Sequence, residues 1–183
     1  AQPQTGSVTT TINPLPTANF APSAIICEDR VISFNDLSVP GAGNIVSWAW
    51  NFGDPNASSS NPNTSTDQNP THIYTVAGDY EIKLIVTTDK GCESIEVSKS
   101  ITVNVNPTAD FTPPLACVAD VNAQFTDLGT VNPGTVTGWD WNFGDPNSNG
   151  ANPNTSTVKN PTHHFTVAGP YTVRQIVISN TGC

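Results

Sequence analysis

The chain has 183 residues, of which 11% are charged and 36% hydrophobic, with a formal net charge of −9. Six Lys and Arg against fifteen Asp and Glu argue against binding to nucleic acid or to an anionic membrane surface, since both need clustered cations. The 16 prolines and 13 glycines, among many Thr, Asn and Ser, favour short strands separated by turns over helices.

Residues 8–14 are the first segment with the character of a strand. They read VTTTINP and resemble residues 101–107, ITVNVNP, which follow a complete set of predicted strands. We therefore expect residues 1–12 to be equivalent to the last strand of a preceding module. Either the chain is a segment of a longer repeat protein, or this strand completes the sandwich of a neighbouring protomer and so builds a filament.

A repeat with an offset of 91 residues organises the rest of the chain. WAWNFGDPN at residues 48–56 recurs as WDWNFGDPN at 139–147, and NPNTST, NPTH and TVAG recur at the same offset. A period near 90 residues is too long for a solenoid unit but suits an independently folding sandwich. The sequence predicts an all-β chain with two modules, residues 13–105 and 106–183, the second lacking its last strand within this chain.

Alternation marks the strands that carry the core of each module. Side chains two positions apart share one face of a strand, so the same-face tryptophan pairs are expected in the core and not on a sugar-stacking platform. Gln175 stands where the first module has Leu84, so it either finds a hydrogen-bond partner or loosens the second core. The predicted core residues are Trp48, Trp50, Phe52, Tyr80, Trp139, Trp141, Phe143 and Tyr171.

Two long segments, residues 53–69 and 144–160, are rich in Asn, Pro and Ser and are expected to form ordered surface loops and candidate recognition surfaces. Asp54 and Asp145 lie where these loops begin. Together with Asn51 and Asn142 they could ligate Ca²⁺ through oxygen atoms. Alternatively, each aspartate caps backbone amides of its own turn.

The four cysteines form two pairs that recur with the repeat, at intervals of 65 and 66 residues. An even count that follows the module predicts one disulfide per module in an oxidising compartment, Cys27 with Cys92 and Cys117 with Cys183. Each bridge would stabilise its module by roughly 4 kcal/mol. Zinc is the competing interpretation, and the sequence has no CxxC or Cys/His cluster to support it.

No constellation for catalysis recurs in the two modules. His72 and His163 recur inside NPTH, and a histidine next to a strand aromatic is expected to pack and to form hydrogen bonds locally. No serine or cysteine nucleophile has a base partner at a repeated position. The sequence therefore predicts that these modules are not an enzyme.

The succession WAWNFGDPN, NPTHIY, AGDYEIKLIV and DKGC resembles the polycystic kidney disease (PKD) domain family over nearly all of both modules. The departures are Pro55 and Pro146 after the aspartate, Pro170 in place of Asp79, and Phe165 in place of Tyr74. The resemblance implies an immunoglobulin-like β-sandwich of a cell-surface or secreted protein.

The Asn- and Thr-rich style of these tandem copies also resembles the giant surface proteins of Bacteroidota, such as gliding-motility adhesins and other cargo of type IX secretion. This implies an extracellular structural or adhesive segment that spaces and presents binding regions. Its expected partners are other repeats, neighbouring protomers, or a surface polysaccharide or protein, without insertion into a membrane. The alternative is an accessory, substrate-binding module of a secreted protease or polysaccharide hydrolase.

Overall fold

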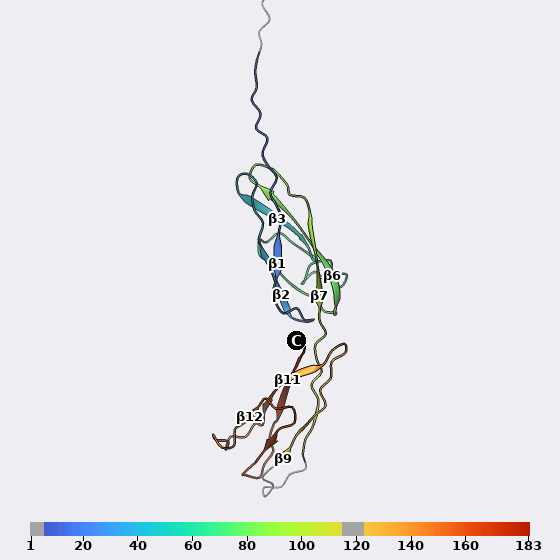
Figure 1. The fold of residues 1–183 in the computed structure, drawn as a ribbon, viewed down its shortest axis with the longest axis vertical. Helices are drawn as coiled ribbons and strands as arrows, with labels where there is room; N and C mark the ends of the chain where they lie inside the picture. The colour runs from blue at the N-terminus through green and yellow to red at the C-terminus, as the bar shows by residue number, and fades with distance from the viewer. Residues whose placement is uncertain (1–5, 115–122) are drawn as a thin grey trace, which may run out of the picture. The chain divides into compact units, whose positions relative to one another are not determined.

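The computed structural model describes residues 6–114 and 123–183, and all regular structure in these ranges consists of β-strands (Figure 1). The chain divides into two compact units. Unit 1 comprises Ala1–Ala24 and Asp29–Thr102, and unit 2 comprises Ile25–Glu28 and Val103–Cys183. Within the described ranges, no helix is long and apolar enough to cross a membrane.

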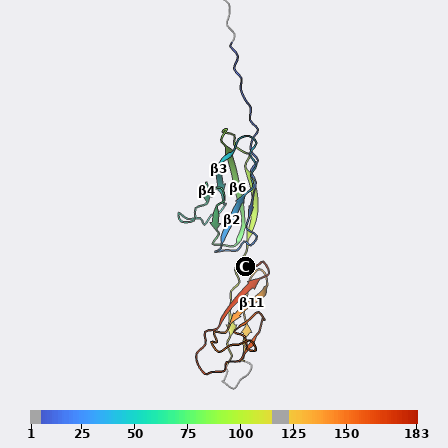
Figure 2. The ribbon, with the colours of Figure 1, turned by 90° about the vertical axis from the view of Figure 1, so that its left-hand side faces the viewer.

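Unit 1 is a sandwich of two sheets (Figure 2). One sheet has the order β1-β2-β5 and the other the order β4-β3-β6-β7. Its strands are β1 (Phe20–Pro22), β2 (Val31–Asp36), β3 (Ile45–Asn51), β4 (Thr64–Ser65), β5 (Thr71–Ile73), β6 (Gly78–Thr88) and β7 (Val97–Val103).

Aromatic side chains join the two sheets of unit 1. The Trp50 ring on β3 lies 5.2 Å from the Phe20 ring on β1 and 6.0 Å from the Phe34 ring on β2. Trp50 and Phe52 are buried, as are the inward residues of β6, whereas Trp48, which faces the last residue of β2, is half-buried. The indole nitrogen of Trp48 donates a hydrogen bond to Asp36 Oδ2 over 2.8 Å.

Unit 2 repeats this arrangement, and several of its strands are shorter than their counterparts in unit 1. Its sheets have the orders β10-β8, β13-β9 and β12-β11-β14. The strands are β8 (Phe111–Thr112), β9 (Ala123–Gln124), β10 (Thr126–Asp127), β11 (Val136–Asn142), β12 (Thr155–Ser156), β13 (Thr162–His163) and β14 (Arg174–Ser179).

The central strand pair has the same register in both units. Trp50 pairs with Leu84 across β3 and β6, and Trp141 pairs with Gln175 across β11 and β14. However, β14 begins at Arg174, whereas its counterpart β6 begins at Gly78, well before Tyr80. The residues of β6 before Lys83 have no partner in β3 and lie beside β7, and no described strand of unit 2 takes the place of β7. The strand in unit 2 therefore starts at the first residue that pairs with β11, and Tyr171 is half-buried. Pro170, in place of Asp79, also lacks a backbone N–H for a strand partner.

Gln175 finds a hydrogen-bond partner, because its Nε2 donates to Asp127 Oδ1 over 2.6 Å. In unit 1 the counterpart carboxylate, Asp36, accepts from Trp48 and Gln68. Trp139 is half-buried, and its indole nitrogen has no hydrogen-bond partner among the described residues. Unit 2 therefore exchanges a tryptophan–aspartate hydrogen bond for a glutamine–aspartate one.

Introducing glutamine into the first core is expected to be costly. Leu84→Gln removes a fully buried leucine and places an amide beside Asp36, which already accepts hydrogen bonds from other donors. We expect the free energy of unfolding of unit 1 to fall by about 3 kcal/mol. Chemical denaturation measures this, with Gln175→Leu as the matched control, for which the expected change is below about 1.5 kcal/mol. Equal losses in the two variants would contradict the proposed exchange of partners.

The segment before β1 pairs with no strand over residues 6–16. Val8 is 95% exposed and Ile12 86% exposed. The first backbone pairing follows at Thr17, which bridges to Val39. The equivalence of residues 1–12 to a last strand stays a prediction, because strand structure needs a partner for its backbone groups.

Candidate functional site

A buried aspartate–histidine pair lies at the same place in both units. His72 Nε2 is 2.9 Å from Asp54 Oδ2, and His163 Nε2 is 3.0 Å from Asp145 Oδ2. The side chains are about 1% exposed in the first pair and 0% in the second. They are the candidate residues that both the repeat and the structure single out.

The turn after β3 holds Asp54 in place. Gly53 has a φ of +65°, and a Cβ atom there would lie 2.4 Å from the Glu81 carbonyl oxygen, so only glycine fits. Asp54 Oδ1 accepts a hydrogen bond from the Asn56 amide, and the Asp54 amide donates to Asn63 Oδ1. Unit 2 has the same bonds from Asn147 to Asp145 and from Asp145 to Asn154.

Aromatic rings enclose the histidine of each pair. The His72 ring stacks on Phe52 at 4.5 Å with an interplanar angle of 15°, and the edge of Tyr74 closes the other side at 4.7 Å. Burial of the Tyr74 hydroxyl, followed by the nearby Asp54 and Tyr80, raises its pKa. His72 Nδ1 and His163 Nδ1 have no hydrogen-bond partner among the described residues.

The pair is therefore a structural hydrogen bond within the core. Because an ionised carboxylate can only accept a hydrogen bond, the ring nitrogen Nε2 of each histidine is the donor. A general base must reach the proton of a substrate, whereas both side chains here are sealed from solvent. The arrangement anchors the long loop to the sheet opposite.

The second pair predicts acid sensitivity. Burial of the Asp145 carboxyl alone would raise its pKa, but hydrogen bonds from Asn147 and His163 outweigh burial and hold the pKa below its ordinary value. A lowered folded-state pKa gives stability above the unfolded-state pKa, near 3.9, that is lost as pH falls through the folded value. We expect unit 2 to lose stability below about pH 4.

Thermal melting between pH 7 and pH 2 measures this loss. Asp145→Asn is expected to be less stable than the parent at pH 7, and its melting temperature should fall less steeply below pH 4. Parallel curves for the two proteins would rule out a contribution from Asp145.

The residues considered for Ca²⁺ are already committed to hydrogen bonds inside each unit. Asn51 Oδ1 accepts from the Gly53 amide and from Asn63 Nδ2, and Asn142 accepts from Gly144 and Asn154 in the same way. Both carboxylate oxygens of Asp54 are likewise occupied. The described residues contain no group of three or more His, Cys, Asp or Glu side chains placed to hold a metal.

Ca²⁺ binding stays a prediction, and the hydrogen-bonded oxygens favour the turn-capping alternative. We therefore expect that replacing a chelator with millimolar Ca²⁺ leaves the melting temperature of each unit unchanged. A rise of several degrees on adding Ca²⁺ would restore the calcium hypothesis.

Each unit has an open groove beside its short edge strand, β4 or β12, and the two grooves share the equivalent positions Ala49/Asp140 and Thr64/Thr155. The groove measures about 420 Å³ in unit 1 and about 510 Å³ in unit 2. The predicted recognition loops supply one wall, through β4 and β12. The lining residues are Ala49, Trp50, Thr64, Ser65, Thr66 and Asp67 in unit 1, and Asp140, Asn142, Thr155, Arg174, Gln175 and Ile176 in unit 2.

Asparagine side chains hold the recognition loop that supplies this wall. Asn61 Nδ2 donates to the Ile73 carbonyl, and the Ile73 amide donates back to Asn61 Oδ1. Asn152 makes the same two bonds with His164. The loops are therefore ordered by side chains that take the place of strand partners.

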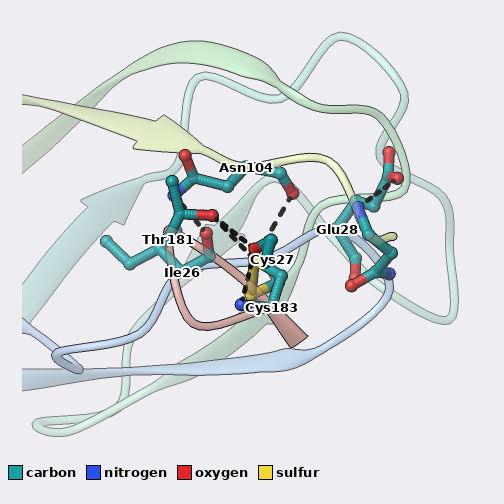
Figure 3. The surroundings of a disulfide bond; sticks show 8 residues. Ile26, Cys27, Glu28, Asn104, Thr181 and Cys183 are labelled. Atoms are coloured by element: carbon teal, nitrogen blue, oxygen red, sulfur yellow. Dashed lines mark hydrogen bonds between the residues drawn. A yellow bond between two sulfur atoms is a disulfide. The ribbon is translucent and has the colours of Figure 1, made fainter. Parts of the chain in front are cut away.

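A disulfide joins Cys27 and Cys183 inside unit 2 (Figure 3). Both cysteines are buried. The segment Ile25–Glu28 pairs with the strand extension after β7, since the Asn104 amide donates to the Ile26 carbonyl and the Glu28 amide donates to the Asn104 carbonyl. Asn106 adds two bonds to Glu28.

The predicted pairing of Cys27 with Cys92 is wrong, and Cys92 is a free, half-buried cysteine. The Asp29 amide, two residues after Cys27, donates to the Tyr74 carbonyl, just before β6 begins. Cys92 follows the other end of β6, whose 11 residues span about 33 Å. A disulfide requires Cα atoms within about 7 Å.

The predicted pairing of Cys117 with Cys183 is also wrong, because Cys183 is bonded to Cys27. Cys117 itself lies outside the described residues. The repeat shows which cysteines of the two modules are equivalent, but it does not show that the two cysteines of one module lie at the same end of a strand.

The comparisons with known proteins agree with this architecture. The family model for the PKD domain matches residues 13–103 and again residues 104–183. The chain therefore belongs to the PKD domain family, whose domains are non-catalytic modules.

Two relatives, a collagenase and a metalloprotease, each match about half of the chain. Collagenase ColA of Bacillus cereus is 35% identical over 86 residues, and pre-pro-metalloprotease PrtV of Vibrio cholerae is 40% identical over 85. These alignments cover 47% and 46% of this chain but only 8% of each relative. The chain thus spans less than a tenth of the length of these relatives.

A solved structure is also similar to part of the chain. The PKD1 domain from V. cholerae metalloprotease PrtV is 36% identical, with a TM-score of 0.40, and the match covers 49% of this chain and 96% of that one.

Proposed function

We propose that this chain is a non-catalytic accessory segment of a longer secreted protease and that its outer grooves hold an extended protein substrate. The observation that carries the proposal is that both units have an open groove beside the edge strand, at β4 and at β12, while the aspartate–histidine pairs are sealed in the core. The likeness to segments of a collagenase and a metalloprotease supports the choice of a protein substrate.

The chemistry of the groove suits a polypeptide backbone. Hydroxyl and amide groups of Thr64, Ser65, Asn142 and Thr155 line it. The strands β4 and β12 are the outermost strands of their sheets, and an exposed strand edge can bind an extended peptide through main-chain hydrogen bonds. The disulfide supports an extracellular location for this role.

Cosedimentation of the 183-residue chain with insoluble collagen tests the proposal. The double variant Thr64→Arg and Thr155→Arg places a long charged side chain in each groove, at positions that are exposed. We expect binding to weaken about tenfold or more, as when a bulky charge blocks a contact surface.

The control is Thr71→Arg with Thr162→Arg, an equivalent pair of exposed threonines on the other sheet of each unit. Binding by this control should equal that of the parent chain. Failure to bind collagen, binding only to an insoluble polysaccharide, or equal loss in both double variants would overturn the proposal.

A second candidate function is a spacer or adhesive segment of a long surface protein, in which strands are shared between protomers. The resemblance of residues 8–14 to residues 101–107 favours it. Light scattering of the purified chain tests the sharing of strands, because a strict monomer at high concentration excludes a filament. The gene beyond these residues separates the two functions, since further repeats favour a spacer and a catalytic domain favours an accessory module.

A further inference from the structure

We propose that Cys92 is the attachment point for a preceding module: it forms a disulfide with the cysteine of that module that corresponds to Cys27. Each module would then be joined to the next by a bond of the same kind as the one between Cys27 and Cys183. This inference concerns how modules are joined and does not depend on what the grooves bind.

The turn that carries Cys92 has the same hydrogen bonds as the turn that carries Cys183. The Thr88 amide donates to the Cys92 carbonyl over 3.0 Å, and the Ser179 amide donates to the Cys183 carbonyl over 2.7 Å. The glycine before each cysteine has a positive φ, +74° at Gly91 and +86° at Gly182. Cys92 therefore sits in the geometry in which Cys183 already forms a disulfide.

The space around the two turns differs in one respect that points to a missing partner. A Cβ atom built on Gly182 would meet the side chain of Ile25 at 3.7 to 3.9 Å. The same atom on Gly91 would meet nothing within 4 Å among the described residues. Cys183 is buried at 4% exposure, whereas Cys92 is half-buried. No described residue thus packs against Gly91 in unit 1, at the place where Ile25 packs against Gly182 in unit 2.

The residues that bind the segment Ile25–Glu28 in unit 2 form a second surface, and this surface also has a counterpart in unit 1. In unit 2, Asn104 and Asn106 bind the backbone of Ile25–Glu28, and Asn106 Nδ2 donates to the Glu28 carbonyl over 2.8 Å. In the alignment of residues 8–14 with 101–107, Asn13 corresponds to Asn106. Ile12, next to it, is 86% exposed. Residues 11–13 are therefore available to pair with the segment of a preceding module that corresponds to Ile25–Glu28.

This second surface and the Cys92 turn lie at the same end of unit 1. A Cβ atom on Gly41 would lie within 2.5 Å of the Pro14 and Leu15 carbonyl oxygens, so the chain after residue 13 passes over this loop. The same loop binds the Cys92 turn, because the Asp89 amide donates to the Asn44 carbonyl over 2.9 Å. One incoming segment can therefore reach both.

The bond forms by thiol–disulfide exchange with a small disulfide such as oxidised glutathione. The thiolate of the incoming cysteine attacks the small disulfide and releases one thiol, and the Cys92 thiolate then attacks the mixed disulfide and releases the second. Two protein thiols are oxidised to one disulfide, and one small disulfide is reduced to two thiols.

A three-module chain tests the proposal. Residues 1–106 are joined in front of residues 14–183, and the Cys92 of the added module is replaced by serine, so that a single Cys92 remains. After oxidation with glutathione, free thiols are alkylated and disulfide-linked peptides are mapped by mass spectrometry. We expect alkylation of Cys92 to fall about tenfold relative to the 183-residue chain, and its peptide to be joined to a Cys27 peptide.

The control replaces only the Cys27 of the added module by serine. Cys92 should then be alkylated as in the 183-residue chain, while the original Cys27 stays bonded to Cys183 and shows that the modules are folded. Free Cys92 in the three-module chain, or Cys92 bonded to Cys117, would overturn the proposal.

Discussion

Replacing Trp50 with alanine is expected to lower the free energy of unfolding of unit 1 by about 3 to 5 kcal/mol. The same change at Trp48 is expected to cost about 1 kcal/mol. The two tryptophans are two residues apart on β3 and share one face of the strand, so the difference arises from where along the strand each one lies.

Trp50 lies at the centre of the sandwich, and Trp48 faces the last residue of β2. The Trp50 ring is 2% exposed and contacts Phe20 and Phe34 of the other sheet, so its removal leaves a cavity that the rigid sheets cannot close. Trp48 loses chiefly its hydrogen bond to Asp36.

Chemical denaturation of the two single variants measures the contrast. The repeat supplies a matched pair in unit 2, where Trp141→Ala should be severe and Trp139→Ala mild, because Trp141 is 0% exposed and Trp139 is half-buried. Losses of similar size at Trp48 and Trp50 would mean that the core near the end of β2 is packed as tightly as the core around Trp50.

The tryptophans also show how far the sequence predicts this fold. Period-two alternation identifies the strands and the inward face, because it depends only on local geometry. How deeply each inward residue is buried depends on how far the opposite sheet extends. That extent is set by strands distant in the chain, so Trp48 and Trp50 look alike in the sequence.

The aspartate–histidine pair could be predicted only in part, because its geometry also depends on strands that are distant in the chain. Asp54 and His72 each recur with the repeat, but they are 18 residues apart. Only the pairing of β2 with β5 brings His72 to the turn at residues 52–54. The groove depends on the pairing of β4 with β3 across a long loop, which no local pattern shows. Recurrence of both an aspartate and a histidine at one offset was the available signal for their contact.

The predicted cysteine pairing was wrong because it depends on where the ends of distant strands lie. Repeat spacing assigns Cys27 and Cys92 to one module, but β6 separates the two ends at which they lie. The hydrogen bonds of Ile25–Glu28 to Asn104 and Asn106 place Cys27 in the second compact unit. A pairing between modules becomes visible only once the direction of each strand is known.

Removal of the Cys27–Cys183 disulfide is expected to lower the free energy of unfolding of unit 2 by about 4 to 5 kcal/mol. The bond joins residues 156 apart in the chain. If unit 1 stays folded while unit 2 unfolds, the flexible part of the closed loop is still on the order of 80 residues, and loop closure of that length carries this entropy.

Cys27→Ser and Cys183→Ser should therefore have the same effect on the unfolding of unit 2, since either one removes the whole bond. Cys92→Ser is the matched control and should change neither unit by more than about 0.5 kcal/mol, because Cys92 is a free thiol. Calorimetry with and without a reducing agent measures the transitions of the two units separately.

A reducing agent should lower the unit 2 transition of the parent chain to that of Cys27→Ser and leave the variant unchanged. If Cys92→Ser instead destabilised unit 1 as much as Cys27→Ser destabilises unit 2, the pairing within one module would be restored. The unequal roles of Cys92 and Cys183 follow from their neighbours, because the two turns are alike and only one of them has the segment Ile25–Glu28 against it.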